Sequence, residues 1–211
     1  VFPEGRKLFS GFIGQVRILT DSTQAVIRIP LNALISADGD RGTVYVGRSA
    51  DTPAFAVDNI AHWCRTELPE RFPDATHLMI EADCGGSNSY RSRVWKRDLQ
   101  EKVADAFGLT VTVCHYPTGA SKWNPIEHRL FSEISKTWAG CPLRSFDDVL
   151  RYIRDTKTQT GLSVQAHLVT QTYERGAQAP DEEMDALSIQ SHDVCPKWNY
   201  TIHPRSPLPQ A

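Results

Sequence analysis

Two acidic residues, Asp83 and Glu127, stand where a carboxylate can reach a cleft. Asp83 follows the apolar run HLMIEA, which predicts a buried strand, and it precedes two glycines that allow the backbone to turn sharply. Glu127 lies one turn inside a helix whose start is predicted at an Asn-Pro pair. Carboxylate oxygens are the ligands that Mg²⁺ and Mn²⁺ prefer, and paired ions of this kind assist phosphoryl transfer. The two residues therefore indicate a divalent-metal site, provided that the fold brings them together.

Each carboxylate also has a purely structural interpretation. An aspartate before glycine is typical of an Asx-turn. The series from Asn124 to Glu127 fits the positions N-cap, N1, N2 and N3 of a helix, so Glu127 would complete a capping box and complement the helix dipole. On local pattern alone, both interpretations stay open.

The elements around these residues predict a mixed α/β sheet. Strands are expected at 16–19, 25–29, 43–47, 77–82 and 110–114, and helices at 52–69, 92–107, 124–134 and 145–157. Three strands followed by alternating helices and strands predict a ribonuclease H-like, five-stranded mixed sheet with helices on both faces. In such sheets, sites gather at the carboxyl ends of the strands, which is where Asp83 is expected.

Length, charge and cysteine usage limit the classes of protein. A chain of 211 residues with 40% hydrophobic content can bury one sizeable core. We expect one ribonuclease H-like domain over residues 1–157, a C-terminal extension of it over 158–203 and a disordered tail over 204–211. Five scattered cysteines without a C-x-x-C pair suggest neither a disulfide framework nor a zinc ribbon, and no apolar run is long enough to cross a membrane. A cytoplasmic protein is the expectation.

The charge distribution is compatible with a polyanionic partner. The net charge is −2, yet residues 85–136 hold eight Lys and Arg against five Asp and Glu. This excess begins just after Asp83 and lies on both sides of Glu127, as a nucleic-acid substrate would require, although it is also ordinary for a solvated helix face.

Several longer motifs resemble one family. The strings EADCGGSNSYRSRVWKRDLQ, VCHYPTGASKWNPIEHRLFSEIS, TQTGLSV and KWNYTI together resemble the DDE-type transposases of bacterial insertion sequences, the Rhodopirellula-type group in particular. The resemblance covers roughly residues 43–203. It implies a ribonuclease H-like fold, magnesium as the metal with manganese as a substitute, and Asp83 and Glu127 as the second and third carboxylates of a catalytic triad. It also implies DNA as the partner, both transposon ends and target, bound by a homo-oligomer, with no membrane involved.

The first carboxylate of the triad has no clear match. The family carries it on the first strand, and residues 1–42 do not match that segment. Asp21 is our candidate because it leaves an early predicted strand; Asp38, Asp40 and Asp51 are also available, although Asp51 fits the cap of its helix better. The family's usual N-terminal DNA-binding helices have no counterpart here either.

Further side chains are expected to contact DNA around the two carboxylates. In the cleft itself Lys122 would contact a phosphate, Trp123 would stack on an unpaired base and His128 would assist proton transfer. Their structural alternatives are solvent exposure, a core plug and a packed histidine, respectively. The complete set of predicted DNA contacts is Lys122, Trp123, Asn124, His128, Arg91, Arg93 and Lys96. A zinc site at Cys84, Cys114 and His115 is disfavoured because the paired spacing is missing.

Three functions are compatible with the sequence. The first is a transposase catalytic domain that cuts and joins DNA strands. The second is a non-catalytic, DNA-binding remnant that keeps the fold but lacks the first carboxylate. The third is a ribonuclease H-like nuclease that cleaves without joining.

Overall fold

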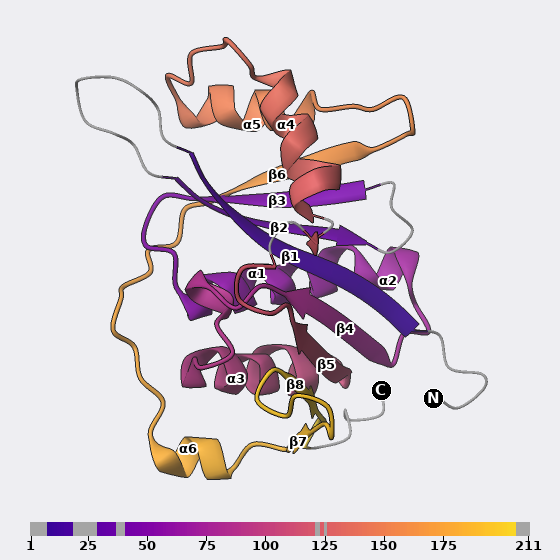
Figure 1. The fold of residues 1–211 in the computed structure, drawn as a ribbon, viewed down its shortest axis with the longest axis vertical. Helices are drawn as coiled ribbons and strands as arrows, with labels where there is room; N and C mark the ends of the chain where they lie inside the picture. The colour runs from indigo at the N-terminus through magenta and orange to yellow at the C-terminus, as the bar shows by residue number, and fades with distance from the viewer. Residues whose placement is uncertain (1–7, 19–28, 37–40, 121–122, 125, 206–211) are drawn as a thin grey trace.

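A computed structural model describes residues 8–18, 29–36, 41–120, 123–124 and 126–205. Within these residues one mixed sheet of eight strands runs through the molecule in the order β6-β3-β2-β1-β4-β5-β8-β7 (Figure 1). The strands are β1 (Leu8–Ile18), β2 (Ile29–Ser36), β3 (Arg41–Gly47), β4 (His77–Ala82), β5 (Thr110–His115), β6 (Ser163–Val169), β7 (Ile189–Ser191) and β8 (Asn199–Ile202).

The central five strands have the ribonuclease H-like arrangement. Strand β2 is antiparallel to β1 and β3, whereas β1, β4 and β5 are parallel neighbours. The predicted mixed sheet is therefore confirmed, but the prediction of five strands is too low. Strand β6 adds to β3 in parallel, and the antiparallel pair β8 and β7 extends the sheet beyond β5.

Helices cover both faces of the sheet (Figure 1). The first face carries α1 (Pro53–Thr66), α2 (Leu68–Arg71), and α3 (Arg93–Leu99), which continues as the π-helix η2 (Gln100–Asp105). The second carries the π-helix η4 (Glu127–Phe131), α4 (Ser132–Thr137) and α5 (Phe146–Arg154). Alternation along β3 separates two cores: Tyr45 packs in the first, while Val44 and Val46 pack in the second.

Local signals explain where the helices begin. The side chains of Thr52, Ser92 and Ser145 accept hydrogen bonds from backbone N–H groups at the starts of α1, α3 and α5. Each of these polar side chains satisfies a donor that has no partner within its helix. The predicted starts of these three helices are confirmed. The long helix formed by α3 and η2 ends at Gly108, which has φ 64° and acts as an αL cap.

The N-terminal strands differ from the prediction. The strand expected at 16–19 is the end of β1, which begins eight residues earlier, at Leu8. The strand expected at 25–29 lies almost entirely outside the described residues, and β2 extends from Ile29 to Ser36. Two glycines in LFSGFIGQVRI weaken the sequence pattern of β1, because glycine has a low intrinsic preference for strands.

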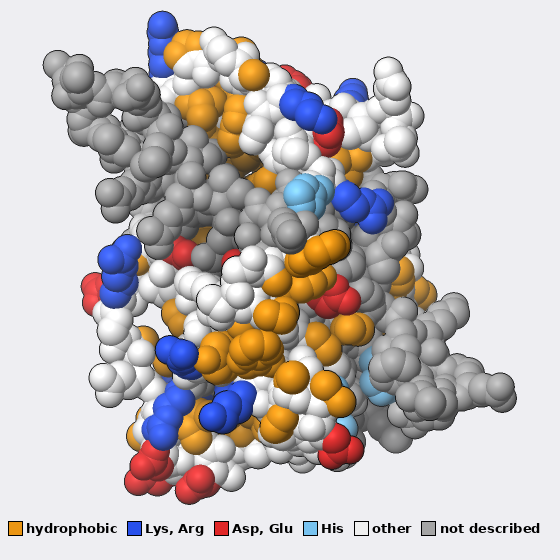
Figure 2. Space-filling view, in the orientation of Figure 1, with side chains coloured by type: hydrophobic (Ala, Val, Ile, Leu, Met, Phe, Trp, Pro, Cys, Tyr) orange, Lys and Arg blue, Asp and Glu red, His pale blue; other side chains and the backbone are white. Residues whose placement is uncertain are grey.

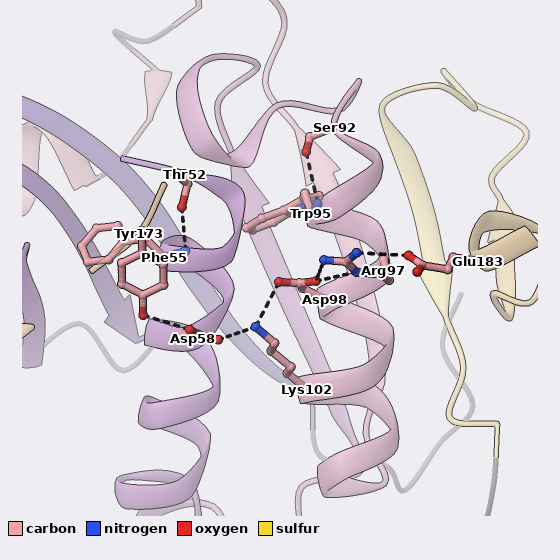
Figure 3. A network of polar contacts seen from close by, with 10 residues as sticks. All are labelled: Thr52, Phe55, Asp58, Ser92, Trp95, Arg97, Asp98, Lys102, Tyr173 and Glu183. Atoms are coloured by element: carbon pink, nitrogen blue, oxygen red, sulfur yellow. Dashed lines mark hydrogen bonds and ion pairs between the residues drawn. The ribbon is translucent and has the colours of Figure 1, made fainter. Parts of the chain in front are cut away.

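The chain after α5 returns to the sheet and then crosses the first helical face. Between β6 and β7, residues 170–188 run past the N-terminal ends of α1 and α3 and contain the short helix α6 (Asp181–Asp185) (Figure 1). Polar contacts fasten this crossing segment: Tyr173 donates to Asp58 of α1 at 2.9 Å, and Arg97 of α3 donates to Glu183 at 3.1 Å (Figure 3). Residues 206–211, in the predicted disordered tail, lie outside the described residues. None of the helices in the described part of the chain has the length and apolar character to span a membrane.

Candidate metal site at the end of β4

Asp83 lies directly after β4, at the carboxyl end of three parallel neighbouring strands. The chain turns there through Gly86, at φ 63°, into the 3₁₀ turn η1 (Gly86–Asn88). The carboxylate is half-buried, and its Oδ1 has no hydrogen-bond partner among the described residues. Burial raises the pKa of Asp83, and the Asn88 amide and the Gly85 backbone N–H oppose that rise. A buried carboxylate oxygen without a protein partner fits a hard divalent cation.

The end of β5 holds the turn after β4 in place. The backbone N–H of Tyr116 donates to the carbonyl of Ala82 at 2.8 Å, and the Cys84 thiol donates to the carbonyl of Tyr116 at 2.7 Å. His115, the last residue of β5, donates from Nδ1 to the backbone carbonyl of Asp83 at 2.9 Å, since a carbonyl can only accept. The backbone around Asp83 is thus fixed by three contacts to one neighbouring segment.

Two residues beside Asp83 escaped the sequence-based site prediction. Asn88 is 0% exposed and neither atom of its amide has a hydrogen-bond partner in the described structure. His115 is buried too, and its Nε2 has no such partner either. The signal for Asn88 was present in the string DCGGSN, five residues after the aspartate. Among the side chains that the structure describes, no group of three or more His, Cys, Asp or Glu could hold a metal ion.

Glu127 opens η4, the π-helix that precedes α4. Asn124 is buried, and its Oδ1 accepts a hydrogen bond from the backbone N–H of Ile126 at 3.2 Å, so the predicted capping role of Asn124 is confirmed. Leu130 of the same helix packs against Gly42 of β3. The side chain of Glu127 is outside what the structure describes, and its meeting with Asp83 stays a prediction. Single π-turns of this type are frequent at functional sites.

The strand beside Asp83 has no acidic residue. Strand β1 runs parallel to β4 with Ile13 opposite Ala82, so Gly14 is the next residue level with Asp83. The whole of Leu8–Ile18 contains neither Asp nor Glu. Asp21, the predicted first carboxylate, and Lys122, a predicted phosphate contact, lie outside the described residues.

Two predicted cleft residues reach the surface. Trp123 is 67% exposed, so its alternative role as a core plug is wrong. His128 is exposed as well, which rules out a packed core histidine. An exposed indole beside the start of η4 has the face that base stacking requires.

The predicted basic contacts have partners within the protein. The Arg91 guanidinium lies 5.1 Å from the centre of the Tyr90 ring and donates to its hydroxyl. Arg93 forms an ion pair of 2.5 Å with Asp181 in α6 and so helps to fasten the crossing segment. Lys96 is half-buried, with its ammonium group 5.2 Å from the centre of the Tyr200 ring, and burial lowers its pKa. On the face shown in Figure 2, several Lys and Arg lie close together over the region of α3, with Asp and Glu below them in the region of α6.

The strand arrangement is that of a ribonuclease H-like domain, with Asp83 directly after β4. The family model described as the Rhodopirellula transposase DDE domain matches residues 23–204, and the chain belongs to that family. Asp21 lies just before the matched range.

Two solved structures match the chain at low identity. The simian T-cell lymphotropic virus intasome in complex with the PP2A regulatory subunit B56 gamma matches with 10% identity and a TM-score of 0.40 over 74% of this chain. The present chain spans about half, 52%, of that integrase chain. The HTLV-2 integrase catalytic core domain in complex with magnesium, in its dimeric form, matches with 11% identity and a TM-score of 0.40 over 74% of this chain and 91% of its own. Among curated proteins, none matches the chain.

Proposed function

We propose that this chain is the catalytic domain of a magnesium-dependent transposase that moves an insertion sequence. The supporting observation is Asp83, a half-buried carboxylate at the carboxyl end of β4 with an oxygen that has no partner in the described structure, in a chain that belongs to a DDE transposase family. In the first reaction, water attacks the phosphodiester at the element end and a 3′-hydroxyl leaves. In the second, that 3′-hydroxyl attacks a phosphodiester of the target and displaces a target 3′-hydroxyl, so that one bond forms for each that breaks.

Asp83 and Glu127 are the proposed holders of Mg²⁺, with Mn²⁺ as a substitute and Asp21 as the candidate for the first carboxylate. When bound, the metal supplies stabilisation of the negative charge that develops on the phosphate oxygens. The residues of the chain orient this site: His115 anchors the backbone of Asp83, and the capped start of η4 fixes the backbone of Glu127.

DNA is the proposed partner, and two element ends must be held together during transposition, which calls for a homo-oligomer on DNA. Trp123, whose side chain is exposed, would stack on a base near the cleaved end, and Lys122 would contact a phosphate beside it. Arg91 is a candidate for a further phosphate contact because it is exposed and contacts the neighbouring Tyr90 through its ring and hydroxyl group.

A second candidate function is favoured by the composition of β1. A remnant that binds DNA but does not cut it is compatible with a first strand that has no Asp or Glu level with Asp83. The third possibility, a nuclease, differs from a transposase only in failing to join strands.

Strand cleavage tests these possibilities. A labelled duplex that carries the element end is incubated with the chain and Mg²⁺ or Mn²⁺, and cleaved and joined products are separated by size. We expect Asp83→Asn and Glu127→Gln to abolish cleavage while Glu101→Gln, an exposed carboxylate on η2, leaves it unchanged. Undiminished cleavage by Asp83→Asn would refute the assignment. DNA binding without cleavage by the unmodified chain would support the remnant, and cleavage without joined products would support the nuclease.

A further inference from the structure

Three buried polar groups around Asp83 lack hydrogen-bond partners in the described structure. They are Oδ1 of Asp83, both amide atoms of Asn88, and Nε2 of His115. Buried polar atoms in folded proteins nearly always have a partner, which is a protein group, an ordered water or a ligand. A cluster of three such groups at the end of one strand therefore indicates that this region is completed by something bound there.

The His115 imidazole is held in one orientation. Nδ1 carries the proton because it donates to the carbonyl of Asp83, so that Nε2 keeps a lone pair. The ring of Tyr90 meets the imidazole edge-on with centroids 6.2 Å apart, and the ring of Tyr200 is tilted against it at 6.1 Å. The hydrogen bond and the two neighbouring rings favour one orientation of the imidazole, which anchors the backbone of Asp83.

Asn88 is the corresponding group for the side chain of Asp83. It sits in η1, which packs against α1, and it is completely buried. Its amide is close enough to the carboxylate to oppose the rise in the pKa of Asp83, although the two groups do not complete a hydrogen bond. A small rotation of either side chain would allow the amide to donate to a carboxylate oxygen.

Such support is needed because of the sequence around Asp83. Two glycines follow it within three residues, and glycine leaves the backbone more conformational freedom than any other residue. Carboxylates that bind a metal are usually hydrogen-bonded to a neighbouring group, and mutation of such a group typically costs about 10- to 100-fold in metal affinity or activity.

We propose that His115 and Asn88 are positioning residues for Asp83 as a metal ligand. His115 fixes the main chain of Asp83, and the Asn88 amide, which makes no hydrogen bond in the described structure, donates to the carboxylate oxygen that faces away from the metal once the metal is bound. The proposal rests on the proposed function, in that Asp83 must bind the metal.

The test is the affinity of the full chain for Mn²⁺, measured from the electron paramagnetic resonance signal of the free ion. His115→Asn keeps a donor at the place of Nδ1, whereas His115→Phe keeps the ring volume but has no donor. We expect His115→Phe to weaken Mn²⁺ binding about 10- to 100-fold and His115→Asn to retain most of the affinity. Asn88→Leu, which has a similar volume and no amide, is expected to weaken binding to a comparable extent. His192→Phe, which also removes a hydrogen-bonded imidazole but lies just after the edge strand β7, two strands beyond β5, is the matched control and should leave the affinity unchanged.

The outcomes separate this proposal from the one on which it rests. Equal affinities for His115→Phe and His115→Asn, or undiminished affinity for Asn88→Leu, would overturn the positioning roles. Undiminished Mn²⁺ binding by Asp83→Ala would instead refute Asp83 as a ligand. Thermal unfolding identifies any variant that does not fold, and if His115→Phe is one of these, Asn88→Leu decides the question.

Discussion

Removal of Asp98 should destabilise the protein more than removal of any exposed carboxylate. Asp98 is 1% exposed and joins Arg97, at 2.7 Å, to Lys102, at 3.1 Å, in the network that binds α1 to α3 (Figure 3). A hydrogen bond to a charged group contributes about 1.5–3 kcal/mol to stability. Without Asp98, Arg97 (21% exposed) keeps Glu183 as a partner and Lys102 (38% exposed) keeps Asp58. Water and these partners therefore offset part of the lost stability. We therefore expect Asp98→Ala to lower the free energy of unfolding by about 3 kcal/mol.

Urea denaturation and thermal unfolding measure this effect. For a domain of this size, 1 kcal/mol shifts Tm by about 2–4 °C, so Asp98→Ala should lower Tm by about 6–12 °C. Glu101→Ala is the control, because Glu101 lies three residues away on the same long helix and is exposed; its effect should stay within about 0.5 kcal/mol. If the two variants unfold at the same urea concentration, the Asp98 network does not contribute to stability as argued.

Three further predictions concern the core, the surface and pH. Gly42→Ala would place a methyl group 2.7 Å from a Leu130 methyl and should lower the free energy of unfolding, measured by urea denaturation, by about 1–3 kcal/mol. Gly85→Ala, whose new methyl group has no atom within 4 Å, should lower it less, and equal losses would contradict this packing. Trp123→Ala should leave Tm unchanged because the indole is exposed, yet weaken binding of single-stranded DNA in fluorescence anisotropy, and an unchanged affinity would exclude stacking. Burial lowers the pKa of His167 below 6.5, so as the pH drops through 6.5 the unfolded chain takes up a proton there before the folded protein does, and the free energy of unfolding should fall. His167→Gln should flatten the dependence of the free energy of unfolding on pH in this range, and an unchanged slope would refute a contribution from His167.

Elements with strong local signals were predictable from the sequence. The strand His77–Ala82 has the predicted bounds, because its apolar residues are bordered by a turn on either side. Helix starts at Thr52, Ser92 and Ser145 followed from capping chemistry, which depends only on residues within one turn.

Strands that depend on distant partners were not predictable in this way. Strand β8 has only four residues and exists because β5, more than 80 residues earlier, presents an open edge to it. Strand β6 likewise pairs with β3 from far away in the chain. The alternation of polar and apolar residues in SVQAHLV of β6 is a strand signal that went unused, whereas the four residues of β8 are too few to indicate a strand without its neighbour.

The candidate site was predictable in part. Asp83 was found because a strand end and two glycines mark it in the sequence. Asn88 and His115 were missed as site residues because burial without a hydrogen-bond partner is a property of the folded protein. Arg93 was predicted to contact phosphate, and its ion pair with Asp181, 88 residues later, was not visible in the local sequence.

The most direct measurement is anomalous diffraction from crystals of the full chain soaked in Mn²⁺. We expect manganese at the carboxyl end of β4, bound by carboxylate oxygens of both Asp83 and Glu127, and the map would identify the first carboxylate at the same time. Manganese absent from Asp83, or bound there while Glu127 points elsewhere, would contradict the proposed metal site.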